Sequence, residues 1–166
     1  MKNFVSFNAK YYKHSNAKGE IGHVERLFED NKNQIKAFAK DNFNCGYSII
    51  DKYQEVYDRV EAAKGKKLQK NANTFIDGVL SFSAESFEEL KKDPEYKKKM
   101  GEYIDKYMEE VKNQTGLTPL GWVFHADEGY RDELSSDMEN KDVYKMNYHA
   151  QLIFFNHDFD KGIAPL

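Results

Sequence analysis

The stretch YKMNYHAQLIFFNH, residues 144–157, decides the fold, because it alternates like a strand and is mostly apolar on both sides. His149 and Gln151 are two residues apart, so in a strand they point the same way, whereas Tyr148 and Ala150 point the other way. A strand that is apolar on both sides belongs in the middle of a sheet. The pair therefore predicts a polar site on the face of a central strand.

A second strand is predicted in PLGWVFHADE, residues 119–128, where Pro and Gly flank a β-rich centre. If the two strands pair antiparallel across the acidic segment 129–143, His125 lies beside His149 and Gln151, and Glu128 can join them at the strand end. Such groups can bind a metal or a phosphate. They can equally be hydrogen-bonded residues on a solvated face, and their spacing alone leaves both interpretations open.

The other elements follow from periodicity and from capping residues. Strands are predicted at 3–12 and 78–83. Helices are predicted at 21–31, at 48–64, at 84–92 with Ser83 as the cap, and at 94–114 with Asp93 as the cap and Gly116 as the stop. Residues 29–47 predict a loop with one helical turn near 35–38, and 129–143 a second loop. The pattern predicts one α+β domain over residues 1–166, with a central antiparallel sheet flanked by helices.

Composition and charge limit the function classes. The chain has 166 residues and is 40% hydrophobic, which fits a packed domain, and its single cysteine, Cys45, excludes an intrachain disulfide. With no long apolar run and no apolar leader in MKNFVSF, we expect a cytoplasmic protein without a membrane partner. The net charge is −3, but residues 126–142 alone carry −5, so the remainder is basic. DNA binding is therefore compatible with the composition.

One lysine cluster is a candidate contact for a DNA backbone. It lies in KGKKLQK and consists of Lys64, Lys66, Lys67 and Lys70. A solvated lysine run explains it equally well.

The segments VFHADE and YHAQLIFF resemble the metal motif of the HUH endonucleases, with glutamine in place of the second histidine. In order, GEIGHVERLFE, GVLSFS, VFHADE and YHAQL are similar to the plasmid mobilisation relaxases of the Mob/Pre (MobV) family. The H-x-E-R motif of that family matches His23, Glu25 and Arg26, and its H-x-D-E motif begins at His125 and ends at Glu128.

This resemblance implies nicking of single-stranded or supercoiled DNA at an origin-like site, with no small-molecule substrate. It implies a Mn²⁺ or Mg²⁺ ion held by His125, His149 and Gln151, with Glu128 in or near the ligand set. It also implies that His23 is the nucleophile that forms a covalent link to the 5′ phosphate. Two roles complete the implied site: Arg26, on the same helical face as His23, holds the phosphate, and Glu25 orients His23.

Two alternatives stay open. A rolling-circle replication initiator would share the metal site but would use a tyrosine, for which Tyr11 and Tyr12 are candidates. The other alternative is a relative that binds DNA but has lost cleavage. Gln151 favours it, because glutamine is a weaker ligand than histidine for transition metals.

The acidic insertion at 129–148 is a further departure from the family, and we expect it to project away from DNA or to cover it as a lid. The chain also ends nine residues after His157, which suggests a shortened or minimal relaxase domain.

Overall fold

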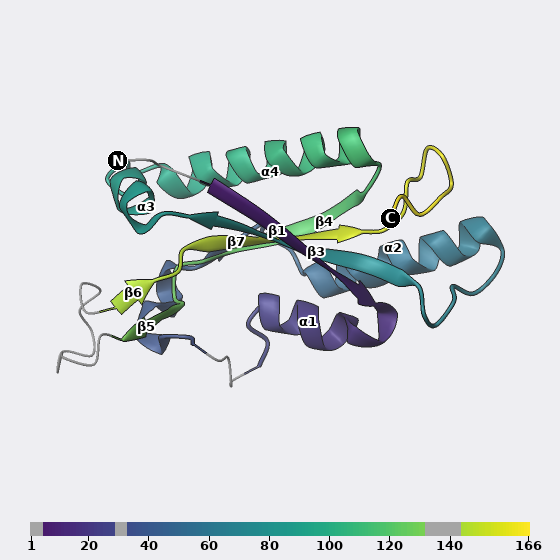
Figure 1. The fold of residues 1–166 in the computed structure, drawn as a ribbon, viewed down its shortest axis with the longest axis horizontal. Coiled ribbons are helices and arrows are strands. Elements are labelled where there is room, and N and C mark those ends of the chain that lie inside the picture. The colour runs from purple at the N-terminus through teal and green to yellow at the C-terminus, as the bar shows by residue number, and fades with distance from the viewer. Residues whose placement is uncertain (1–4, 29–32, 132–143) are drawn as a thin grey trace.

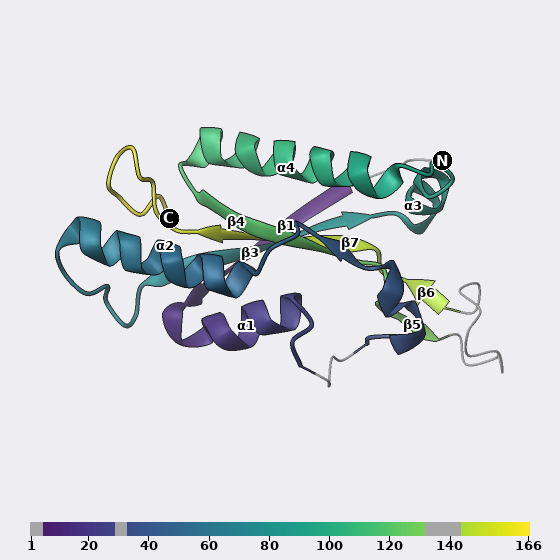
Figure 2. The same cartoon turned by 180° about the vertical axis from the view of Figure 1, so that it is seen from behind.

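A five-stranded antiparallel sheet, in the order β1-β3-β7-β4-β2, forms the centre of the computed structural model, which describes residues 5–28, 33–131 and 144–166. Figures 1 and 2 show α1 and α2 on one face of this sheet and α3 and α4 on the other. The α+β prediction is confirmed. Among the described residues, no helix is long and apolar enough to cross a membrane.

The bounds of the elements are as follows. The main sheet contains β1 (Val5–Lys13), β2 (Phe43–Asn44), β3 (Asn73–Phe82), β4 (Thr118–His125) and β7 (His149–Phe155). The α-helices are α1 (Ala17–Val24), α2 (Ile49–Lys64), α3 (Ala84–Leu90) and α4 (Tyr96–Thr115), with 3-10 helices at His14–Asn16 and Lys36–Asp41. A separate hairpin contains β5 (Gly129–Arg131) and β6 (Tyr144–Met146).

Strand β7 lies at the centre of the sheet and is buried on both faces. Leu152 and Phe154 pack in the core under α3 and α4, whereas Ile153 and Phe155 pack in the core under α1 and α2. Each large apolar side chain buried in this way contributes about 2–3 kcal/mol. The alternation predicted from the sequence is confirmed, and it places His149 on the face that α1 covers.

Residues 144–157 form two strands, β6 and β7, and not the single strand predicted from the sequence. The break falls at Asn147, whose N–H donates to the Glu128 carbonyl at 2.9 Å, while the Tyr148 carbonyl accepts from Phe82 N–H at 2.9 Å. Residues before the break pair with β5, so the predicted loop 129–143 begins as a strand. Residues 132–143, which carry most of the acidic insertion, lie outside the described residues.

The first helix also differs from its prediction, since it ends at Val24 and not near residue 31. Arg26 adopts a left-handed backbone (φ 57°), and its N–H donates to the His23 carbonyl at 3.2 Å. Leu27 N–H donates to the Gly22 carbonyl at 2.9 Å. These two bonds define a Schellman motif, which closes the helix. Leu27 is consequently outside the helix and 61% exposed.

Smaller corrections concern β3 and α4. Strand β3 begins at Asn73, five residues before the predicted strand 78–83. The sequence did not indicate this earlier start, because Phe75 and Ile76 are buried on opposite faces and give no alternating pattern. Helix α4 is capped at Glu95, not at Asp93, whose carboxylate instead accepts the Glu95 N–H at 2.9 Å. Its end at Gly116, in a left-handed conformation, is confirmed.

Candidate metal centre

His125 and His149 are direct cross-strand partners on β4 and β7. Both are buried, and His125 Nδ1 lies 3.2 Å from His149 Nε2. The carboxylate of Glu128 completes the cluster, 3.7 Å from His125 Nδ1 and 3.8 Å from His149 Nε2. One ligand atom from each of the three residues therefore lies within 4.8 Å of the others.

The hydrogen bonds of the two imidazoles decide what this cluster can bind. His125 Nε2 lies 2.8 Å from the Val24 carbonyl, and His149 Nδ1 lies 2.9 Å from the Asn147 carbonyl. A carbonyl only accepts, so these two nitrogens carry the protons. The remaining nitrogens therefore direct lone pairs at each other and at Glu128. Three converging acceptors repel one another unless a cation lies between them, and the donor set suits a divalent metal.

Electrostatics keep the imidazole of His125 neutral. Burial lowers its pKa well below the usual value, and the neighbouring charge of Arg26 lowers it further. A neutral imidazole is the form that binds a metal.

Arg26 and Asp127 form the next layer around the cluster. Arg26 Nη2 contacts Asp127 Oδ1 at 3.0 Å and Glu128 Oε1 at 2.5 Å, and Gln34 donates to Asp127 Oδ2 at 2.7 Å. Burial raises the pKa of Asp127, but hydrogen bonding with Asn42 and the charge of Arg26 outweigh it and leave the pKa lowered. Asp127 is therefore an ionised group that holds Arg26 beside Glu128.

The H-x-E-R residues have three separate environments. His23 is in the last turn of α1, exposed, with its ring edge-on to Phe28 at 5.2 Å. It directly precedes Val24, whose carbonyl holds His125. The predicted shared helical face of His23 and Arg26 is wrong, because the helix ends between them.

Glu25 has a different contact from the one expected. Its carboxylate accepts the N–H groups of Ile49 at 2.6 Å and Ile50 at 3.1 Å, which caps the N-terminus of α2. Both oxygens thus bind the first backbone N–H groups of α2, a structural contact that the sequence did not predict.

Gln151 lies next to the cluster, on the same face as His149. Its Nε2 donates to Asp77 Oδ2 at 2.9 Å. Asp77 was not among the residues predicted from the sequence, although a lone acid in the apolar run TFIDGVL was the signal that would have found it.

The two tyrosines considered as nucleophiles lie away from the cluster. Tyr12 on β1 is the cross-strand partner of Phe75 on β3, and Phe75 is the cross-strand partner of Phe155 on β7. Phe155 is six residues along β7 from His149, a separation of about 20 Å at 3.3 Å per residue. Tyr11 is in register with Ile76, whose side chain packs in the core of the opposite face.

The lysine cluster is also at the far end of the sheet. Lys64 ends α2, and the other three lysines lie in the connection to β3, at the right of Figure 1, whereas β5 and β6 lie at the left. All four are exposed, and Lys67 forms an ion pair with Glu61 at 2.9 Å. These lysines are thus separate from the metal cluster.

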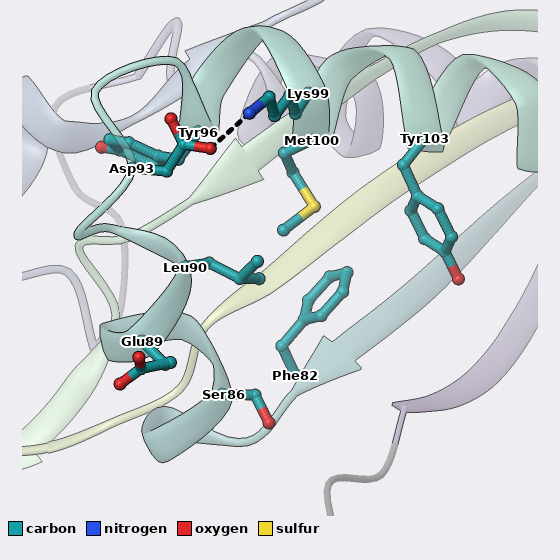
Figure 3. Close-up of a pocket in the computed structure, with 9 residues that line it drawn as sticks. All are labelled: Phe82, Ser86, Glu89, Leu90, Asp93, Tyr96, Lys99, Met100 and Tyr103. Carbon is teal, nitrogen blue, oxygen red and sulfur yellow. Dashed lines mark hydrogen bonds and ion pairs between the residues drawn. The ribbon is translucent and has the colours of Figure 1, made fainter.

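An apolar pocket of about 470 Å³ lies on the opposite face of the sheet, between α3 and α4. Figure 3 shows Phe82, Leu90 and Met100 pointing into it. Tyr103 lines it and is 48% exposed. The cluster faces α1, so this pocket is not part of it.

Three solved structures of the MobM relaxase domain (MOBV; Mob_Pre) are similar to this chain. All are manganese-bound crystal structures with plasmid pMV158 oriT DNA. The one at pH 5.5 has a TM-score of 0.66 and 16% identity over 94% of this chain and 72% of that chain. The one at pH 4.6 has a TM-score of 0.67 and 15% identity over 97% and 74%. The chain has the fold of the MobM relaxase domain.

No family model matches the sequence, and neither does any curated protein. At 15–16% identity, the similarity to MobM establishes the fold and does not by itself assign the site.

Proposed function

We propose that this chain is a metal-dependent DNA-nicking enzyme that acts as a relaxase on single-stranded DNA at an origin-like site in the cytoplasm. The observation that carries the proposal is the junction of α1 with the cluster: the carbonyl of Val24, next to His23, accepts a hydrogen bond from His125. The H-x-E-R segment and the candidate metal centre are thereby joined in one site. The DNA and manganese bound by the MobM neighbours support the same substrate class.

His125, His149 and Glu128, with Gln151 beside them, are the residues that would hold Mn²⁺ or Mg²⁺. When bound, such an ion polarises a phosphate and neutralises charge that develops in the transition state.

The nucleophile in this proposal is His23. A ring nitrogen attacks phosphorus and forms an N–P bond, while the bond from phosphorus to the 3′ oxygen breaks. The protein then carries the 5′ phosphate, and the 3′ oxygen leaves as a hydroxyl. The 3′ oxygen gains one proton in this step, and the imidazole of His23 loses one.

Arg26 would hold the phosphate. Among the residues that the structure describes, its Nε is buried without a hydrogen-bond partner, although Nη2 contacts Asp127 and Glu128. A guanidinium has five N–H donors in a fixed fork, so Arg26 can stay on Asp127 and still donate to a phosphate oxygen. The left-handed backbone at this position is the kind of local strain that is found at functional sites.

A tyrosine-dependent initiator is less consistent with this arrangement, because Tyr12 lies about 20 Å along the sheet from His149.

The test is covalent capture from a random pool of single-stranded oligonucleotides with Mn²⁺, followed by denaturation and sequencing of the DNA that stays attached. We expect attachment with the wild type and with His14→Ala, since His14 lies elsewhere, on Tyr53. His23→Ala and excess EDTA should abolish it. DNA bound without any attachment would indicate a relative that has lost cleavage, and attachment lost only in Tyr12→Phe would indicate an initiator.

A further inference from the structure

Asp77 is a buried acid that the proposed chemistry does not use. It lies on β3, on the face covered by α1, and is 7% exposed. Its Oδ2 accepts from Gln151, and its Oδ1 is buried with no hydrogen-bond partner among the described residues. A half-satisfied buried carboxylate costs stability, so a stabilising role does not account for it.

The contact between Asp77 and Gln151 determines which way the amide of Gln151 faces. An ionised carboxylate only accepts, so the amide nitrogen has to face Asp77. The amide is planar, and its oxygen therefore faces away from β3. Strand β7 lies between β3 and β4, so away from β3 means toward β4.

Strand β4 carries His125 at this level of the sheet. Gln151 is opposite Val123 on β4, two residues before His125, and it follows His149 by two residues on β7. The amide oxygen is thus directed to the side of the sheet where the cluster lies. With the opposite amide orientation, an NH₂ group would face the cluster, and NH₂ has no lone pair to offer a cation.

We propose that Asp77 is a positioning residue that fixes the amide of Gln151 so that its oxygen serves as a metal ligand. This inference rests on the proposed function and extends it to a residue outside the predicted ligand set. Gln151 then acts as a fourth ligand, beside two imidazoles and one carboxylate. An added oxygen ligand shifts the preference toward the harder ions, Mn²⁺ and Mg²⁺.

The test is a double-mutant cycle on Mn²⁺ affinity, measured by calorimetry on the whole chain without DNA. Asp77→Asn offers an amide that can donate or accept, so Gln151 is no longer held in one orientation. We expect Asp77→Asn and Gln151→Ala each to weaken Mn²⁺ binding about tenfold, the lower range for outer-shell partners. In the Gln151→Ala background, Asp77→Asn should have no further effect.

Two further variants separate positioning from a structural role. A glutamate at position 151 has two equivalent oxygens and needs no orientation, so Asp77→Asn combined with Gln151→Glu should recover most of the Mn²⁺ affinity. This pair also keeps a hydrogen bond between the two positions, which protects folding. Asp158→Asn removes a buried carboxylate at the other end of the sheet and should leave Mn²⁺ affinity unchanged.

The inference would be overturned if the wild type and Asp77→Asn bound Mn²⁺ with equal affinity. It would also be overturned if Asp77→Asn weakened Mn²⁺ binding by the same factor in the wild type and in Gln151→Ala. Either result would leave the proposed DNA cleavage intact. A wild type that attaches no DNA but loses Mn²⁺ affinity in Asp77→Asn would support the inference while contradicting the proposed function. A wild type that binds no Mn²⁺ would overturn both.

Discussion

His125 and His149 each donate one ring N–H to a backbone carbonyl and direct the other nitrogen inward. In the proposed metal centre both inward nitrogens are ligands, so removing one imidazole would remove a ligand and leave the other unsupported. We predict that His125→Ala weakens Mn²⁺ binding by more than the roughly 10- to 100-fold that loss of an outer-shell partner costs, because it removes a metal-bound group. Calorimetric titration with Mn²⁺ measures it, and His14→Ala is the matched control. Equal affinities in the wild type and His125→Ala would exclude this cluster as the metal site.

The neutral state of His125 also predicts how stability depends on pH in the metal-free protein. Its pKa is lowered by burial, so between pH 6.5 and 4 the unfolded chain binds a proton that the folded chain does not. The free energy of unfolding should therefore fall as pH falls below about 6.5, by up to about 1.4 kcal/mol per pH unit from this group.

Urea unfolding in EDTA at several pH values tests this, with His125→Gln as the comparison. Burial raises the pKa of Asp77 to about 6, and that shift acts with the opposite sign, because the folded state then binds the extra proton. The difference between wild type and variant isolates His125. Parallel curves for the two proteins would contradict the prediction.

The pairing of His125 with His149 could be predicted from sequence, because alternation along two strands fixes which side chains share a face. The contacts of Glu25 and Asp77 could not. Glu25 binds backbone groups of α2, and backbone groups carry no sequence signal. Asp77 is paired across a register that only the folded sheet defines.

Helix α1 ends with an arginine in a position that glycine usually takes. This explains why its end differs from the prediction: the sequence contains no glycine stop, and Leu27 and Phe28 continue the helical period. The break between β6 and β7 is hidden for a similar reason, since Asn147 and Tyr148 are not flanked by Gly or Pro. Helices α2 and α4 agree closely with their predictions because Gly65 and Gly116 end them.

The left-handed conformation of Arg26 makes a testable difference between two substitutions. Both Arg26→Gly and Arg26→Ala remove the pairing with Asp127, but only alanine keeps the cost of a Cβ in this conformation, about 1 kcal/mol. Arg26→Gly should therefore be the more stable variant by about that amount in urea unfolding. Both should lose covalent DNA attachment. An alanine variant as stable as the glycine variant would show that the helix does not end in this way.

The junction of α1 with α2 depends on Glu25, which caps α2 with two hydrogen bonds. We predict that Glu25→Ala lowers the free energy of unfolding by about 2–3 kcal/mol, because two helix N–H groups lose a charged acceptor. Ser48→Ala, which removes a single cap bond on the same helix, should cost about 1 kcal/mol. Mn²⁺ affinity should be retained in both variants at a temperature where they are folded. A loss confined to Mn²⁺ affinity would instead place Glu25 in the site.

The molecule as a whole has the candidate metal centre at one end of the α1–α2 face and the lysine cluster at the other end, beyond the last residues of β7. This arrangement predicts that the lysines contribute affinity for DNA without contributing to metal binding. Lys66→Ala combined with Lys70→Ala should weaken single-stranded DNA binding and lower the slope of log K against log salt by about 1.4, at about 0.7 for each phosphate that the protein no longer neutralises. Mn²⁺ affinity should not change.

The matched control is Lys98→Ala with Lys106→Ala, because these exposed lysines lie on α4, across the sheet. Fluorescence anisotropy over a salt series measures both slopes, and equal slopes for the two double variants would show that DNA does not reach the lysine cluster.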